Sequence, residues 1–155
     1  MKRVFKLSIL LAMMTIAGCN KENSDDGKGV GTLTINGISY TITDCCFAIT
    51  KTGYNSLHFQ NGGNNGVNHV NITLIPNELS SKTYTELDSD IVGVGIWIDE
   101  ETNYNGIKDF QMVVNKSGKT YEVTISGKAL VNEESQEFYD YSVTFKGKIR
   151  VEKEK

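Results

Sequence analysis

The feature that most constrains the fold is a strict alternation of apolar and polar side chains near the C-terminus. Every second residue is apolar: Tyr139, Tyr141, Val143, Phe145, Ile149 and Val151. The residues on the other face are polar or charged: Asp140, Ser142, Thr144, Lys146, Lys148 and Arg150. Successive side chains of a β-strand point to opposite faces, so this pattern predicts a strand with one buried and one solvated face.

The same alternation occurs earlier, on both sides of Asn36-Gly37. Leu33 and Ile35 precede this pair, and Ile38, Tyr40 and Ile42 follow it. An Asn-Gly pair between two alternating runs is a strong hairpin signal, because both turn positions need positive φ. Residues 32–43 are therefore predicted to form a β-hairpin.

Similar runs at residues 70–74, 91–98, 110–114 and 121–125 raise the expected number of strands to about eight. The chain contains no amphipathic stretch long enough for a real helix. We therefore predict an all-β fold, an antiparallel β-sandwich of about eight strands. A small lipocalin-like β-barrel is the alternative, since both architectures bury one face of each strand.

Residues 1–18 have the organisation of a secretory signal peptide. Lys2, Arg3 and Lys6 precede an uncharged apolar run from Leu7, and small residues lead to Cys19. The run is too short for a transmembrane helix, which needs about 20 apolar residues.

The end of this segment, Ile16-Ala17-Gly18-Cys19, resembles the lipobox of bacterial lipoproteins, in which the cysteine is lipidated and becomes residue one. The resemblance implies a thioether diacylglyceryl group and an N-acyl chain such as palmitate on Cys19. Such chains anchor a protein stably in a bilayer. The alternative is an ordinary secretory signal in which Cys19 is incidental.

The polar segment after Cys19 predicts a flexible tether over residues 19–31, followed by one β domain over residues 32–153. Acidic residues soon after the cysteine also resemble the signals that export some Bacteroidetes lipoproteins to the cell surface. We expect a lipid-anchored outer-membrane protein, with the cell surface favoured over the periplasmic face.

The chain as a whole is similar to small Bacteroidetes lipoproteins of uncharacterised function. The similarity depends on the lipobox, the tether, the Asn36-Gly37 hairpin, Thr83-Tyr84-Thr85, and closing strands such as Ile125-Ser126-Gly127 and Phe145-Lys146-Gly147. These are β-structure motifs, so the resemblance implies a location and a fold but no active residues.

Charge restricts the partners. Residues 1–18 hold three of the 16 basic residues and none of the 19 acidic ones, so the mature chain has a net charge of about −6. This net charge argues against nucleic acid and against anionic lipid head groups, because both attract a basic face.

The adjacent residues Cys45 and Cys46 leave three possibilities open: two separate thiols, a strained bond between neighbours, or a bond to another chain. His58 and His69 lie on the polar face of their strands and are expected to face solvent. If they met across neighbouring strands, they could bind a metal together with Asp44 or another carboxylate. Two imidazoles without a third ligand at defined spacing are weak evidence, so no metal site is predicted.

The loop Asp99–Gly106 is rich in oxygen donors, but Met112 stands where a calcium-binding EF-hand needs a bidentate Glu. No cofactor motif and no catalytic constellation is recognised.

The most suggestive site residues are Trp97 and Tyr104. Trp97 shares a strand face with Gly93 and Gly95, and the other face, from Val92 to Ile98, is expected to be core. Glycines in a strand often mark the close approach of a ligand. Trp97 and Tyr104 would then stack on a sugar ring.

The leading hypothesis is a non-catalytic lipoprotein that binds a ligand or a protein partner at the cell envelope. A glycan-binding module is the first alternative, and a hydrolase of envelope polymers or an enzyme inhibitor is the second.

Overall fold

The computed structural model describes residues 27–61, 69–99, 102–132 and 134–154. The predicted signal peptide, Cys19 and the tether up to residue 26 lie outside the described residues. The described elements are ten β-strands: β1 (Lys28–Ile35), β2 (Ile38–Ile49), β3 (Asn55–Gln60), β4 (His69–Leu74), β5 (Thr83–Thr85), β6 (Ile91–Trp97), β7 (Asn103–Ser117), β8 (Thr120–Asn132), β9 (Glu137–Gly147) and β10 (Arg150–Lys153).

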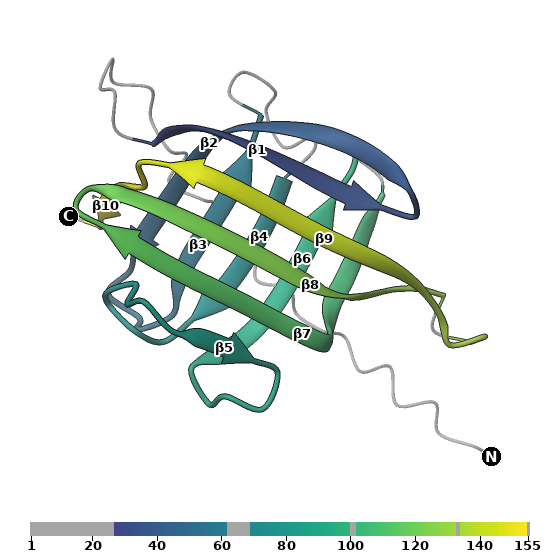
Figure 1. The fold of residues 1–155 in the computed structure, drawn as a ribbon. Coiled ribbons are helices and arrows are strands. Elements are labelled where there is room, and N and C mark those ends of the chain that lie inside the picture. The colour runs from purple at the N-terminus through teal and green to yellow at the C-terminus, as the bar shows by residue number, and fades with distance from the viewer. Residues whose placement is uncertain (1–26, 62–68, 100–101, 133, 155) are drawn as a thin grey trace.

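Eight of these strands close into an antiparallel barrel (Figure 1). Each barrel strand pairs with the next along the chain, and β9 pairs with β1 to complete the circle. Leu33 in β1 shows the closure, since its partners are Tyr40 in β2 and Val143 in β9. The all-β prediction is confirmed, whereas the preferred sandwich is wrong and the barrel alternative is right.

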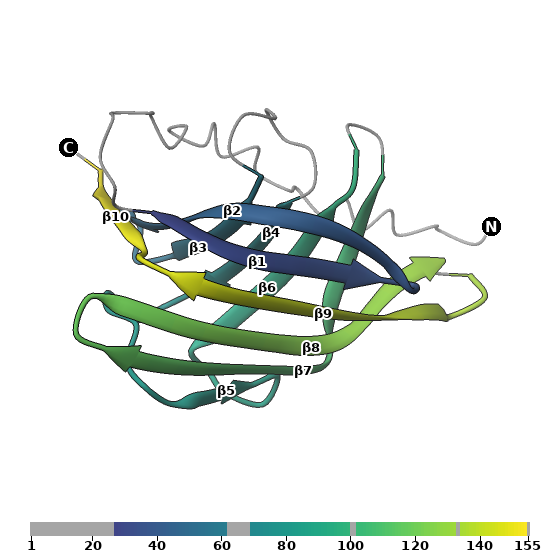
Figure 2. The same ribbon diagram turned by 45° about the horizontal axis from the view of Figure 1, so that its top comes forward.

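The reason for this error is visible in the shape of the barrel. Strands β1, β9, β8 and β7 form one side, and β2, β3, β4 and β6 lie behind them (Figures 1 and 2). A flattened barrel and a sandwich bury the same faces of the same strands. Alternation therefore cannot distinguish them, because the difference depends on which strands pair at the edges.

The first strand begins earlier than the sequence indicates. Residues 28–31 belong to β1, where Gly29 pairs with Gly147, so the predicted tether is shorter than 19–31. A Cβ atom at Gly31 would overlap the backbone carbonyl oxygen of Thr144. Gly29 and Gly31, which the sequence placed in the tether, instead allow β1 and β9 to approach closely. The Asn36-Gly37 hairpin is confirmed, with φ of 49° and 76° at its two turn residues.

The barrel lumen is filled with side chains. The largest fully buried ones are Tyr84, Phe47, Phe59, Phe110, Leu33, Ile42, Leu57, Ile72, Leu74, Ile96, Met112 and Ile125. Tyr84 comes from β5, which pairs with residues 111–113 of β7, whereas β6 pairs only with residues 103–105. The connection between β4 and β6 thus completes the core where β6 and β7 separate.

The alternation of β6 shifts within the strand. Thr73 pairs with Gly93 but the next residue, Leu74, pairs with Ile91, so Val92 forms a β-bulge. Ile91 is buried and Val92 is 49% exposed, which corrects the prediction that Val92 is core. Val94 and Ile96 are buried as expected.

The last strand, β10, runs parallel to β2 and pairs with residues 46–49. The Arg150 guanidinium donates to both carboxylate oxygens of Asp44, at 3.3 and 3.2 Å. Gly27 lies at this same end of the barrel, because its carbonyl oxygen accepts a hydrogen bond from the Cys45 backbone N–H. We call this end, where β1 begins and β9 ends, the proximal end. The opposite end, where β1 ends and β9 begins, is the distal end.

Candidate functional site

Trp97 lies on the outer surface of the barrel. It pairs with His69 of β4, and the two rings stack with centroids 4.5 Å apart and planes 9° from parallel. The indole also covers Gly95, where an added Cβ would overlap the ring. From the sequence, the space at Gly95 was assigned to a ligand. In the structure this space is occupied by the Trp97 indole. Of the two glycines that share a face with Trp97, only Gly93 faces open space.

Tyr104 lies on the opposite face of the sheet. Its β6 partner is Ile96, a buried core residue, whereas Trp97 pairs with Asn103. Partners across antiparallel strands share a face, so Tyr104 points inward and Trp97 outward. The structure therefore does not bring the two predicted site residues together.

Tyr104 instead belongs to a group of three half-buried tyrosines at the distal end, Tyr40, Tyr104 and Tyr139, which we call the aromatic end. They come from β2, β7 and β9, and all three pack against the core. The rings of Tyr104 and Tyr139 meet edge to face, with centroids 6.4 Å apart. This geometry leaves ring surface and hydroxyl groups at the rim of the barrel, a combination suited to polar ring-shaped ligands.

The electrostatics of Tyr104 reflect this position. Partial burial raises the pKa of the Tyr104 phenol, and the nearby Tyr139, Asp99 and Tyr40 raise it further. Its hydroxyl is therefore neutral at physiological pH and can both donate and accept a hydrogen bond. The buried Tyr141 hydroxyl donates a hydrogen bond to the Gly106 carbonyl oxygen at 2.6 Å, which links β9 to β7 across β8.

His58 does not face solvent as the sequence predicted. It lies on the outer face of β3 between Cys46 and Asn71, yet only 5% of it is exposed. Burial lowers the pKa of His58 to about 4, with a smaller contribution from His69. The neighbouring Asn71 has a buried side-chain oxygen without a hydrogen-bond partner.

The two adjacent cysteines differ in state. Cys45 points into the core and is a free thiol, and burial, followed by the Asp44 charge, raises its pKa. Cys46 is on the outer face, fully buried and disulfide-bonded. The two sulfurs are thus not joined to each other. The possibility of two separate thiols is therefore wrong for Cys46.

No cluster of three or more His, Cys, Asp or Glu side chains able to hold a metal occurs among the described residues. Part of the Asp99–Gly106 loop, residues 100–101, lies outside them. In the described part, Asp99 accepts a hydrogen bond from the Thr102 backbone N–H at 2.6 Å and Ile98 donates to the Thr102 carbonyl. These contacts are those of a tight turn.

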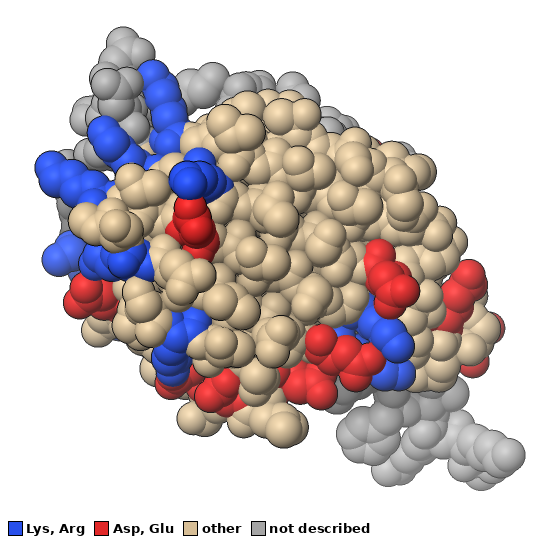
Figure 3. All heavy atoms as spheres, viewed as in Figure 1, with Lys and Arg blue, Asp and Glu red and all other residues tan. Residues whose placement is uncertain are grey.

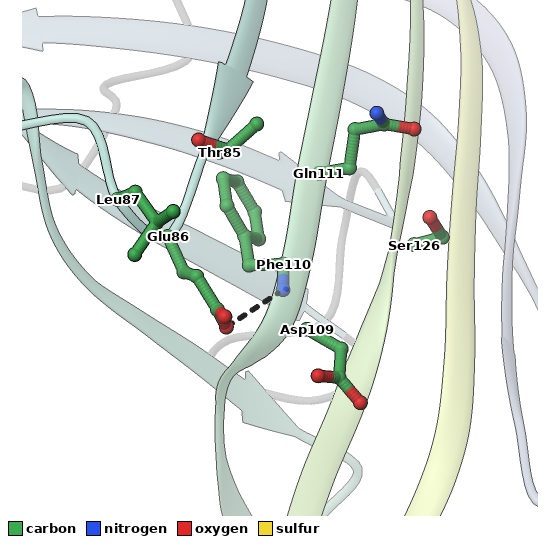
Figure 4. Close-up of a pocket in the computed structure, with 7 residues that line it drawn as sticks. All are labelled: Thr85, Glu86, Leu87, Asp109, Phe110, Gln111 and Ser126. Carbon is green, nitrogen blue, oxygen red and sulfur yellow. Dashed lines mark hydrogen bonds between the residues drawn. The ribbon is translucent and has the colours of Figure 1, made fainter.

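A shallow depression of about 370 Å³ lies on the outer surface between β5, β7 and β8 (Figure 4). It contains two carboxylates, the minimum for acid–base hydrolysis of a glycan. Each is already engaged: Glu86 accepts the Phe110 backbone N–H at 3.3 Å, and Asp109 pairs with Lys128 at 3.3 Å. Both carboxylates are exposed, unlike a general acid held in an apolar pocket.

Comparison of the chain with family models, with curated proteins and with solved structures finds no significant match. Within the described ranges, no helix is long and apolar enough to span a bilayer.

Proposed function

We propose that this chain is a non-catalytic lipoprotein that binds a ligand or a protein partner at the distal end of its barrel. Cys19 carries the lipid, and the β domain is held at the outer membrane, on the cell surface in preference to the periplasmic face. The proposal of an anchor is based on the lipobox-like Ile16-Ala17-Gly18-Cys19 and the basic, apolar segment before it.

One observation favours the distal end as the binding surface. Gly27, the first described residue, enters the barrel at the proximal end, while the aromatic end is at the other end. Cys19 precedes Gly27 by eight residues, which span at most about 28 Å when extended. A lipid on Cys19 therefore keeps the proximal end within that distance of the bilayer, and the aromatic end is the end of the barrel remote from the attachment.

The first ligand class to test is a carbohydrate. Sugar rings have apolar C–H faces that stack on aromatic side chains and hydroxyl groups that hydrogen-bond to phenols. Tyr104 therefore keeps the role predicted for it, with Tyr139 and Tyr40 as its neighbours in place of Trp97. A protein partner bound at the same rim is the second candidate, because tyrosine is enriched at such interfaces.

The binding surface is tested by tyrosine replacement. Tyr104→Ala and Tyr139→Ala should each weaken binding to any glycan that the wild type retains, by about tenfold or more for a stacking ring. Tyr54→Ala is the matched control, since Tyr54 is 47% exposed and lies at the proximal end. Loss of binding in Trp97→Ala but not in Tyr104→Ala would move the site to the outer surface. No binding to a broad glycan panel would eliminate the carbohydrate and leave the protein partner.

The anchor is tested separately, in cells. Wild type should incorporate radioactive palmitate and sediment with outer membranes, and Cys19→Ser should do neither. A thioether uses the Cys19 sulfur, so a lipidated Cys19 cannot also form a disulfide with Cys46. Recovery of a Cys19–Cys46 linked peptide from the mature protein would refute the anchor.

A further inference from the structure

Charge is unevenly distributed over the barrel, although the whole chain is acidic. In Figure 3, Lys and Arg side chains gather at the proximal end, on the left of the view, while carboxylates dominate the right. Five lysines define what we call the basic corner, namely Lys28, Lys119, Lys146, Lys148 and Lys153. The described carboxylates of the distal end include Asp99, Glu134, Glu137 and Asp140.

The strand register brings the basic corner together from three strands, β1, β9 and β10, and from the β7–β8 and β9–β10 connections. Lys28 begins β1, and its carbonyl oxygen accepts the Lys148 backbone N–H at 3.1 Å. Lys146 lies near the end of β9 and pairs with Val30 of β1. Lys119 occupies the turn between β7 and β8, and Lys153 ends β10. Lys146, Lys148 and Lys153 lie within eight residues of one another, whereas Lys28 and Lys119 come from distant parts of the chain, so only the fold completes the basic corner.

Most acids near the basic corner are already paired. Glu122 pairs with Lys146, and Glu152 pairs with Arg150 at 2.9 Å. Within the described part of the chain, Lys119 and Lys148 have no carboxylate partner, so their charges are available to an external anion.

Exposed apolar side chains lie at the same end. Val30 is 78% exposed beside Lys146, Val151 of β10 is 53% exposed, and Tyr54 in the turn between β2 and β3 is 47% exposed. Lysines mixed with a few exposed apolar groups are typical of surfaces that rest on lipid head groups.

We propose that the basic corner docks onto the phosphate-bearing head groups of the membrane that holds the lipid anchor. This inference rests on the proposed lipidation of Cys19, which limits the distance between Gly27 and the bilayer to about 28 Å. Docking fixes the orientation of the barrel, with its proximal end on the membrane and its aromatic end outward. A tether alone restricts only the distance.

The net charge of about −6 does not oppose this docking. Charges separated by more than a Debye length, about 8–10 Å, are largely screened from each other at physiological salt. β9 contains eleven residues, so the acids at the start of β9, Glu137 and Asp140, are separated from Lys146 by roughly 20–30 Å. Glu22, Asp25 and Asp26 precede the barrel and outnumber Lys21, so any attraction must come from the barrel itself.

The test uses the mature chain, residues 19–155, with Cys19→Ser, so that no lipid contributes to binding. All barrel strands lie between residues 28 and 147, so removal of residues 1–18 removes none of them. Vesicles of phosphatidylcholine with 30% phosphatidylglycerol are compared with vesicles of phosphatidylcholine alone, by co-sedimentation at low and high salt. We expect salt-sensitive binding to the anionic vesicles only.

Two double variants locate the contact. K119Q/K148Q should weaken binding by about 25-fold, from about fivefold for each lysine near the surface. K108Q/K128Q removes the same charge on the distal side of the barrel and should change binding by less than twofold. Circular dichroism confirms that both variants are folded.

Equal weakening by the two double variants would show that only net charge matters and would overturn the inference. So would equal binding to neutral and anionic vesicles, or no binding to either. Because this protein carries no lipid, such a result leaves the palmitate labelling of the full-length chain unaffected, and failure of the labelling leaves the vesicle result unaffected. The two proposals can therefore fail independently.

Discussion

The clearest quantitative consequence of the structure concerns acid sensitivity and His58. Burial keeps this imidazole neutral in the folded protein, with its pKa lowered from 6.5 to about 4. In the unfolded chain the same side chain is protonated below about pH 6.5. Between these values the unfolded state binds one more proton, so the free energy of unfolding falls as the pH falls.

The size of the effect follows from the two pKa values. Each pH unit in this window costs up to about 1.4 kcal/mol, so acidification from pH 7 to pH 4 removes about 3 kcal/mol. That is a large share of the 5–15 kcal/mol typical of a folded domain. Most carboxylates remain ionised down to about pH 4.5, so the loss above that pH is assigned mainly to His58.

Urea unfolding at several pH values between 7.5 and 4.5 measures this loss. The protein contains one tryptophan, Trp97, whose fluorescence reports the transition. Because His69 stacks on Trp97, the transition midpoint and slope should be used in place of the signal amplitude. We expect the free energy of unfolding to decrease by about 2 kcal/mol or more across this range.

His58→Leu provides the control, because leucine does not titrate and has a similar volume. The variant should lose the dependence between pH 6.5 and 4.5. Parallel profiles for wild type and His58→Leu would refute the reasoning. If the variant does not fold, an NMR titration of the wild-type imidazole decides, and a pKa near 6.5 would contradict the burial argument.

Two further changes test the packing of the barrel. Gly31→Ala should destabilise the protein by about 2 kcal/mol, because the new methyl group overlaps the backbone of β9. The control Gly93→Ala adds a methyl group that faces open space, and it should cost less than about 0.5 kcal/mol. Equal effects of the two substitutions in thermal unfolding would contradict the close approach of β1 and β9. Arg150→Ala should cost about 3 kcal/mol, because it leaves Asp44 largely buried without its bidentate partner, the two side chains being 15% and 14% exposed. If urea unfolding shows that the free energy of unfolding falls by less than about 0.5 kcal/mol, the Arg150–Asp44 pair does not stabilise the packing of β10 on β2.

Several parts of the fold could be predicted from the sequence because they depend on neighbours along the chain. The period of two assigned most strands and their buried faces, and Asn36-Gly37 located the first hairpin. The bulge at Val92 could not be predicted, since it depends on how β6 aligns with β4. For the same reason the polar segment that includes Gly29 and Gly31 was assigned to the tether, although the approach of β9 requires these glycines.

The candidate site was predicted less well, and the reason is again long-range pairing. Trp97 and Tyr104 are close in sequence, but the β6–β7 hairpin places them on opposite faces of the sheet. Tyr104 and Tyr139 are distant in sequence, and only the barrel brings their rings together. No local pattern in the sequence connects these two tyrosines.

By itself, the sequence determined the class of fold, the first hairpin and the expectation of a lipid anchor at Cys19. These depend on local alternation, turn chemistry and a short linear motif. The tertiary structure alone decided that the sheet closes into a barrel, that His58 is buried, and that lysines and tyrosines gather at opposite ends. Closure, burial and charge clustering arise between residues far apart in the chain, where pairing and packing determine which side chains meet.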